Sequence, residues 1–208
     1  MLKLSKEFII VNALTFGRVP FVFLFLFGAA WHVYRPESFW IAYMALGFLI
    51  VASVTDLFDG LLARRWKVES QFGAMADPLM DKVFYLVVFP VFTWLLPIFH
   101  PEAKNHALLM MLITVAYMLR DQWVTFLRSV GALYGQDCRA NWLGKFRTAY
   151  SFPFACVAYV HIAIKPFFLP VEFVYLLEAV ALFVNFWTMY TYTYDYLPSL
   201  RKAMRLED

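Results

Sequence analysis

Residues 38–59 read SFWIAYMALGFLIVASVTDLFD, an apolar run whose only charged residues are two aspartates near its end, Asp56 and Asp59. A run of this length is enough for a helix to cross a bilayer, which needs roughly 20 residues. The whole chain of 208 residues agrees, since 62% of it is hydrophobic and only 16% is charged. A soluble domain has about 25% charged residues. The composition therefore indicates an integral membrane protein and excludes a disordered chain, a coiled coil and a disulfide-stapled secreted scaffold.

Working outward from this run, five more apolar segments are marked off by charges, prolines and turns. Met1–Phe8 has the character of a short N-terminal amphipathic helix lying on the membrane surface. No internal repeat or second domain is visible, so residues 1–208 are expected to form a single all-α membrane domain. The six predicted transmembrane helices are Asn12–Trp31, Ser38–Asp59, Pro78–Leu96, Ala107–Leu127 with an extension toward Tyr134, Phe146–Ile164 and Val171–Tyr192.

The lysines and arginines are distributed unevenly between the two sides. Three loops on one side hold one each, Arg35, Lys104 and Lys165, whereas the other 15 of the 18 lie toward the opposite side. The positive-inside rule then places both termini and the basic loops in the cytosol. An even number of spans agrees with this, because it places both termini on the same side of the membrane. The sequence predicts a protein of the inner (cytoplasmic) membrane with its charged side toward the cytosol.

Four aspartates lie at the ends of predicted membrane spans, where burying a carboxylate costs free energy. Asp56 and Asp59 end the second predicted span, and Asp77 and Asp81 begin the third. Carboxylates near membrane depth usually face a cavity or a partner, and the spacings place each pair on one helix face. If the two helices are adjacent, four like charges converge, and such a cluster requires cations. Oxygen ligands suit Mg²⁺ or Mn²⁺, and two such ions commonly stabilise a displacement at phosphorus.

Local structure offers another interpretation for half of this set. Asp77-Pro78 is a good N-cap followed by a proline at the first helical position. Asp59-Gly60 is a common turn dipeptide. Neither interpretation explains why the other two aspartates fall on the same helix faces.

The segment from Asp56 to Asp81 reads D-x-x-D-G-x-x-A-R-x8-G-x-x-x-D-x-x-x-D. It resembles the signature of the CDP-alcohol phosphatidyltransferase family at all eight fixed positions. The resemblance implies a fold of six transmembrane helices, a cytosol-facing active site and a homodimer. It also implies that an alcohol hydroxyl attacks the phosphorus attached to diacylglycerol in CDP-diacylglycerol, expelling CMP. The implied partners are this lipid substrate, an acceptor alcohol and membrane lipids, with no nucleic acid.

The same resemblance assigns roles by position. Two divalent ions, Mg²⁺ or Mn²⁺, would be held by Asp56, Asp59, Asp77 and Asp81. Asp81 would also be the general base that accepts the hydroxyl proton. The positions that resemble those around the CDP moiety are Asp56, Gly60, Ala63, Arg64, Gly73 and Asp77.

A second polar set lies in the fourth predicted span and the loop after it: Arg120, Asp121, Arg128, Arg139, Lys145 and Arg147. Arg120 and Asp121 could form a buried salt bridge, and the other cations could simply set the topology. Alternatively, the set is a pocket for an anionic acceptor, because arginine presents a rigid fork of donors to phosphate oxygens. We expect the acceptor phosphate to be bound by Arg120, Arg128, Lys145 and Arg147.

Three segments are similar to those of phosphatidylglycerophosphate synthases within this family. Residues 120–128 resemble R-E-x-x-x-S-x-x-R, residues 144–148 resemble G-K-x-K-T, and residues 11–18 resemble P-N-x-L-T-x-x-R. The departures are Asp121 for Glu, Thr125 for Ser, Arg147 for Lys and Val11 for Pro. The resemblance implies sn-glycerol 3-phosphate as acceptor.

Other acceptors and other classes stay open. Inositol phosphate and phosphatidylglycerol are alternative acceptors for the same chemistry. An intramembrane prenyltransferase also holds a magnesium-bound diphosphate between aspartate-bearing helices. A divalent-cation transporter would carry a carboxylate cluster too, although six helices without an inverted repeat argue against that class.

Overall fold

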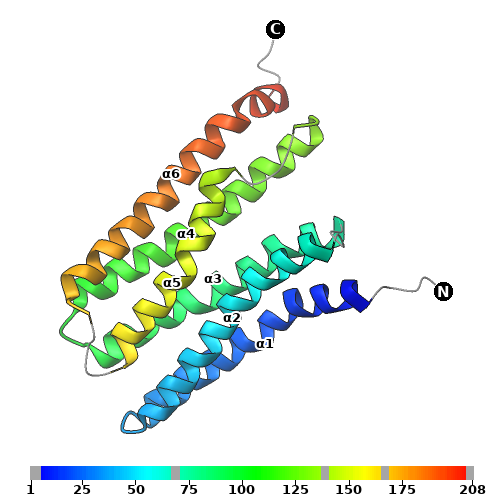
Figure 1. The fold of residues 1–208 in the computed structure, drawn as a ribbon. Helices are drawn as coiled ribbons and strands as arrows, with labels where there is room; N and C mark the ends of the chain where they lie inside the picture. Colours follow the sequence, from blue (N-terminus) through cyan, green and yellow to red (C-terminus); the bar gives the residue numbers. More distant parts are fainter. Residues whose placement is uncertain (1–5, 67–70, 137–140, 165–168, 205–208) are drawn as a thin grey trace.

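The computed structural model describes residues 6–66, 71–136, 141–164 and 169–204, and all regular structure within them is helical. Asn141 begins α5 by accepting a hydrogen bond from the Gly144 backbone N–H on its side chain, at 2.8 Å. The helices run antiparallel along the chain, so that α1 begins and α6 ends at the same end of the bundle (Figure 1). The six helices are α1 (Lys6–Tyr34), α2 (Phe39–Trp66), α3 (Gln71–Phe99), α4 (Lys104–Leu133), α5 (Trp142–Ala163) and α6 (Val171–Ala203).

The helices exist where the sequence predicts them, but most are longer than predicted. α2 continues past Asp59-Gly60 to Trp66, and α3 begins at Gln71, so Asp77-Pro78 lies inside a helix. The turn and N-cap interpretations of these dipeptides are therefore wrong. Prolines are tolerated in membrane helices because neighbouring groups satisfy the freed backbone carbonyls.

The chain ends also differ from expectation. α6 continues eleven residues beyond the predicted end at Tyr192, as far as Ala203. Of the surface helix expected over Met1–Phe8, only residues 6–8 are described, and they form the first turn of α1. At the other end, α4 extends to Leu133, as the predicted extension toward Tyr134 required.

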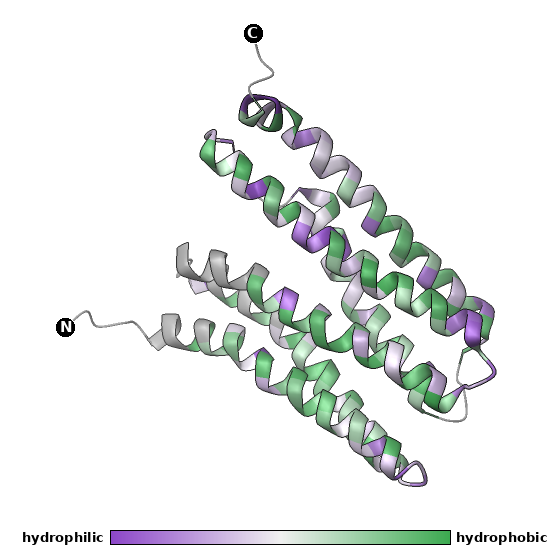
Figure 2. Ribbon diagram, turned by 180° about the vertical axis from the view of Figure 1, so that it is seen from behind, coloured by the Kyte–Doolittle hydropathy of each residue, from purple (hydrophilic) through white to green (hydrophobic). Residues whose placement is uncertain are grey.

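The apolar character of the helices supports an integral membrane protein. Within the described residues, four segments are long and apolar enough to span a bilayer: Ala13–Tyr34, Leu79–Phe99, Lys104–Leu133 and Val171–Ala203. Phe39–Thr55 of α2 is apolar but shorter. Hydrophobic residues dominate the helices, and hydrophilic ones gather toward loops and at a few points within the bundle (Figure 2). The count of six spans stays a prediction.

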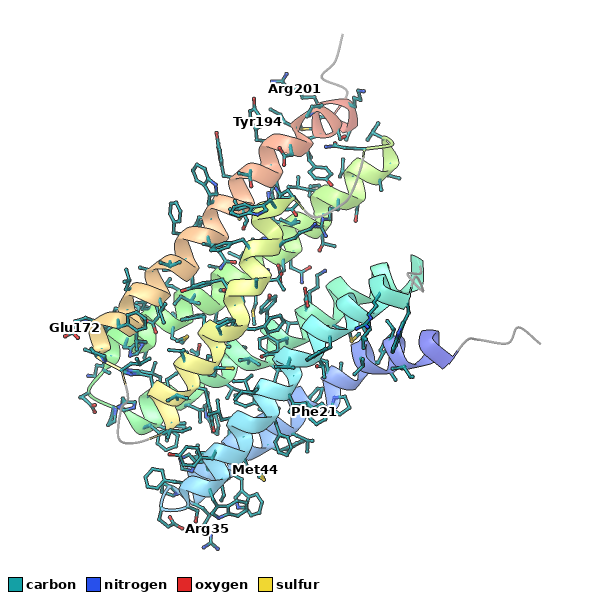
Figure 3. The ribbon with its side chains drawn as sticks, in the orientation of Figure 1. Phe21, Arg35, Met44, Glu172, Tyr194 and Arg201 are labelled. Atoms are coloured by element: carbon teal, nitrogen blue, oxygen red, sulfur yellow. The ribbon has the colours of Figure 1, made fainter. Side chains whose placement is uncertain are left out.

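The bundle has two parts, which α3 and α5 join. α1 packs against α2 and α3, whereas α4 packs against α6 and α3, and α5 contacts α2, α3 and α6. The main core combines aliphatic side chains with aromatic rings, of which Phe25, Phe84, Phe89 and Phe92 are fully buried. Arg35 lies at the end where α1 turns into α2, and Arg201 lies near the opposite end (Figure 3). The cavity described below is built where α3, α4, α5 and α6 approach one another.

Candidate functional site

A cavity of about 150 Å³ lies between α3, α4, α5 and α6. This is about ten times the space that one water molecule needs. Two tyrosines, Tyr85 and Tyr192, contribute to its wall. Four cationic side chains face two carboxylates, so the cavity carries a net positive charge suited to an anion. The charged residues in the lining are Asp81, Lys82, Arg120, Asp121, Arg128 and Arg147.

Asp81 stands at the α3 side of this cavity. Its Oδ1 accepts a hydrogen bond from Arg18 Nη1 at 2.8 Å, and the two groups form an ion pair. The Arg18 side chain is buried in α1, whereas a quarter of the Asp81 side chain stays exposed. A carboxylate anchored on one side and open on the other can accept a proton from a bound ligand.

The other three predicted metal ligands are placed by their helices alone. Asp56 and Asp59 lie in the last three turns of α2, and Asp77 lies one turn before Asp81 in α3. α2 ends at Trp66 and α3 begins at Gln71, so these turns share one end of the bundle (Figure 1). Their side chains lie outside the described part of the structure, as do the surroundings of the predicted CDP-contacting residues Gly60, Ala63, Arg64 and Gly73.

Because three of the four aspartate side chains are not described, the four-carboxylate cluster stays a prediction. Among the described side chains, no group of three or more histidines, cysteines or carboxylates could hold a metal ion. Asp81 contributes one oxygen-donor group of the type that Mg²⁺ or Mn²⁺ prefers. The helix positions of the remaining three are compatible with oxygen donors joining it from the same end of the bundle.

Asp121 holds two arginines at the opposite wall of the cavity. Its Oδ1 lies 3.0 Å from Arg120 Nη1 and 3.0 Å from Arg147 Nη1. All three side chains are buried or nearly so. The structure therefore contains the buried Arg120–Asp121 salt bridge, and it also places that pair in the cavity wall, so the two interpretations of the sequence are compatible. Two guanidinium groups on one carboxylate leave one positive charge for a ligand.

Arg147 is held in a fixed orientation. Its guanidinium carbon lies 4.6 Å from the Tyr85 ring centroid and 4.5 Å from that of Tyr117. Nε donates a hydrogen bond to Asn185 Oδ1 at 2.9 Å. Nη2 has no hydrogen-bond partner among the described residues. An unsatisfied buried donor costs about 1–3 kcal/mol, so an anion or water that reached Nη2 would be bound favourably.

The remaining cations of the second polar set are placed differently from one another. Arg128 lines the cavity and donates from Nη2 to the Tyr192 hydroxyl at 3.0 Å. Lys145, in the first turn of α5, is exposed and is not among the cavity-lining residues. Arg139 lies outside the described residues. The structure thus brings together Arg120, Arg128 and Arg147 but leaves Lys145 on the surface nearby.

Several residues of the site are not assigned a role by the sequence alone. Arg18 is the last residue of the segment 11–18 and has no role assigned there, and no motif in the sequence includes Tyr85 or Tyr117. On α6, the polar residues follow one another at spacings of three and four, which places them on one helix face. That periodicity is a signal in the sequence that could have identified a buried polar face. These residues are Asn185, Thr188, Tyr192, Tyr196 and Ser199, and all five are buried.

A family model described as CDP-alcohol phosphatidyltransferase matches residues 8–188. This range includes every described residue of the cavity except Tyr192. The chain belongs to the CDP-alcohol phosphatidyltransferase family. The family membership inferred from the Asp56–Asp81 signature is confirmed.

Two relatives of this chain carry the same name. A protein of Cereibacter sphaeroides named CDP-diacylglycerol–glycerol-3-phosphate 3-phosphatidyltransferase is 47% identical over 62 residues, which are 30% of this chain and 27% of the relative. A protein of Escherichia coli K12 with the same name is 32% identical over 117 residues, 55% of this chain and 59% of the relative. The matched segments therefore span less than two thirds of either relative.

Proposed function

We propose that this protein transfers the phosphatidyl group from CDP-diacylglycerol to sn-glycerol 3-phosphate, giving phosphatidylglycerophosphate and CMP. The observation that carries the proposal is the cavity in which one carboxylate, Asp81, faces a wall of three arginines. Family membership supplies the class of reaction. The names of the relatives support glycerol 3-phosphate as acceptor.

The arginine wall favours an acceptor that carries a phosphate. Arg120, Arg128 and Arg147 come from two helices and line the same cavity. An alcohol without a charge would not offset three guanidinium groups, of which Asp121 neutralises only one. Arginine forks match the geometry of phosphate oxygens and bind them in pairs. In this proposal the acceptor phosphate is bound by the arginines while its hydroxyl points toward Asp81.

The reaction needs a proton acceptor and a means of offsetting charge. The acceptor oxygen forms a bond to the phosphorus that carries diacylglycerol, the bond from that phosphorus to CMP breaks, and the hydroxyl proton passes to Asp81. Arg18 holds the Asp81 carboxylate from its buried side, at 2.8 Å. The acceptor arginines keep the attacking molecule in place, which lowers the entropic cost of the encounter.

Divalent ions fit the donor chemistry of the proposed site. Asp56, Asp59, Asp77 and Asp81 would hold two ions, Mg²⁺ or Mn²⁺, and the CDP moiety would lie against Gly60, Ala63, Arg64 and Gly73 together with Asp56 and Asp77. When bound, the ions would neutralise negative charge on the diphosphate and on the leaving CMP. We further propose that the site faces the cytosol, that both termini are cytosolic and that the protein is a homodimer, as the family resemblance implies.

The test is CMP release from CDP-diacylglycerol by the purified full-length protein, with a panel of acceptors and identification of each lipid product. The panel contains glycerol 3-phosphate, inositol phosphate and phosphatidylglycerol, with Mg²⁺ or Mn²⁺ present or removed by a chelator. We expect release to depend on glycerol 3-phosphate and on the metal. Release with inositol phosphate or phosphatidylglycerol instead would reassign the acceptor. No release with any acceptor would favour the divalent-cation transporter.

A further inference from the structure

Tyr192 of α6 lies among the cations of the cavity. Its side chain is 1% exposed. The hydroxyl oxygen accepts a hydrogen bond from Arg128 Nη2 at 3.0 Å and another from the backbone N–H of Asn141 at 3.1 Å. Asn141 is the N-cap of α5. A single phenol oxygen therefore connects a cavity arginine on α4 with the start of α5.

The ring of Tyr192 contacts a second cavity arginine. The guanidinium carbons of Arg120 and Arg128 lie 5.2 Å and 5.3 Å from the ring centroid. Both distances are within the roughly 6 Å over which a cation is attracted to an aromatic face. We propose that Tyr192 is a positioning residue for the acceptor: it fixes Arg120 and Arg128 in the arrangement that receives the acceptor phosphate. The proposal rests on the proposed function, because it assigns a residue to the same site.

Gly144 explains how the tyrosine fits against α5. A Cβ atom at Gly144 would lie 2.7 Å from the Tyr192 hydroxyl oxygen and 3.4 Å from Tyr192 Cε2. The same atom would lie 3.3 Å from Asn141 Oδ1. Only glycine lets the phenol approach the first turn of α5 this closely. The sequence of that turn is thus adapted to the hydroxyl as well as to the ring.

A purely structural role for Tyr192 makes a different prediction. The ring also belongs to a small core cluster with Val124, Leu127 and Tyr196. Phenylalanine would preserve that packing and the ring under Arg120. It would remove only the hydroxyl, which accepts hydrogen bonds from Arg128 and from the Asn141 backbone N–H. Tyr192→Phe therefore separates positioning from packing.

The first experiment measures CMP release by Tyr192→Phe against the concentration of each substrate in turn. A hydrogen bond to a charged group corresponds to about a factor of ten in an equilibrium constant. We therefore expect the KM for glycerol 3-phosphate to rise about tenfold, while kcat and the KM for CDP-diacylglycerol change little. Tyr194→Phe, an exposed tyrosine two residues away on the same helix (Figure 3), is the matched control. An unchanged acceptor KM, or an equal rise in both KM values, would overturn the proposal.

The second experiment uses Gly144→Ala in the natural background and in Tyr192→Phe. If the added methyl group acts by displacing the hydroxyl, it should raise the acceptor KM strongly in the natural background and weakly in Tyr192→Phe. Such non-additivity is expected for residues in direct contact. Fully additive effects would show that Gly144 does not act through the Tyr192 hydroxyl and would remove this support for the proposal.

A third measurement does not depend on turnover. Inorganic phosphate, without CDP-diacylglycerol, should raise the thermal unfolding temperature of the purified protein, and Tyr192→Phe should need about tenfold more phosphate for the same rise. Equal phosphate requirements, or no response in the natural protein, would overturn the positioning role. If the natural protein binds phosphate through Tyr192 but releases no CMP with glycerol 3-phosphate, the proposed function fails and the anion-holding role stands.

Discussion

Arg18 of α1 and Asp81 of α3 are joined by a 2.8 Å ion pair, although 63 residues separate them in the sequence. Arg18 is completely buried, and Asp81 is partly open to the cavity. α1 thereby takes part in a site whose other described residues come from α3, α4, α5 and α6. A change at Arg18 should affect the carboxylate more than the arginine wall.

Arg18→Met should lower kcat by at least about tenfold, because a positioned base contributes roughly 10²–10⁴ to the rate and would lose its anchor. Arg18→Lys keeps the positive charge but loses the forked donors of the guanidinium group, so we expect a kcat between those of the natural protein and Arg18→Met. The measurement is CMP release at saturating concentrations of both substrates, with helix content checked by circular dichroism. Arg35→Met, an exposed arginine at the opposite end of the bundle (Figure 3), is the control. A normal kcat in Arg18→Met would show that the ion pair does not serve the reaction.

Asp81→Asn should abolish proton acceptance while keeping the size of the side chain. We expect turnover to fall by about 10²–10⁴, with a smaller effect on the binding of CDP-diacylglycerol. The two quantities are separated by measuring CMP release and, independently, equilibrium binding of the CDP-lipid. Near-normal turnover would exclude Asp81 as the general base. Glu37→Gln, an exposed carboxylate in the α1–α2 turn, controls for the loss of a negative charge elsewhere.

The positions of the helices can be predicted from the sequence, whereas their exact ends cannot. The long apolar runs predicted the helices because a membrane helix is defined by the composition of one continuous segment. The helix ends are predicted less accurately: the predicted span Pro78–Leu96 begins at one proline and stops before another, Pro97, yet α3 contains both. Membrane helices tolerate such prolines, so the rules that end soluble helices do not apply.

The arginines of the site can be predicted from the sequence, whereas their aromatic partners cannot. Arg120, Arg128 and Arg147 stand out in the sequence because cations in apolar runs are rare, and the cavity brings them together. Their partners Tyr85, Tyr117 and Tyr192 do not stand out, because aromatics make up 20% of the chain. Their role depends on which helices pack together, and spacing within one helix does not contain that information.

Arg128 and Lys145 are both predicted from the sequence to bind the acceptor phosphate, but their positions in the structure predict unequal contributions. Arg128→Ala removes a cavity-lining guanidinium, so the KM for glycerol 3-phosphate should rise by about tenfold or more. Lys145→Ala removes an exposed charge that does not line the cavity, and exposed charges contribute little at physiological ionic strength. We expect its acceptor KM to change less than about threefold. The check is a pair of acceptor titrations at saturating CDP-diacylglycerol, and a larger effect for Lys145→Ala would contradict this assignment.

His106 and Glu178 form a buried pair at the end of the bundle away from the cavity. His106 Nε2 lies 2.5 Å from Glu178 Oε1, and the Glu178 side chain is fully buried. His106→Ala would leave the carboxyl group without this partner, which should cost about 3–5 kcal/mol of stability if the pair is ionised. Thermal unfolding in detergent measures the loss. Glu172 is an exposed carboxylate in the first turn of α6, the helix that carries Glu178 (Figure 3). Its replacement, Glu172→Gln, should leave the unfolding temperature unchanged. An equally small effect of His106→Ala would mean that the pair does not stabilise the fold.

Gly131 and Gly47 both lie in helices, but Gly131 is tightly packed whereas Gly47 has open space around it. Alanine should therefore lower the stability at Gly131 and raise it at Gly47. A Cβ at Gly131 would overlap the ring of Tyr196, which is buried and stacks on Tyr192 with centroids 6.3 Å apart. Overpacking of this kind costs about 1–3 kcal/mol, more than the roughly 0.5–1 kcal/mol that alanine gains over glycine in a helix. At Gly47 no atom lies within 4 Å of the added carbon, so only the gain remains. Unfolding temperatures of Gly131→Ala and Gly47→Ala in the same detergent test this; stabilisation by Gly131→Ala would show that the Tyr196 ring moves aside without cost.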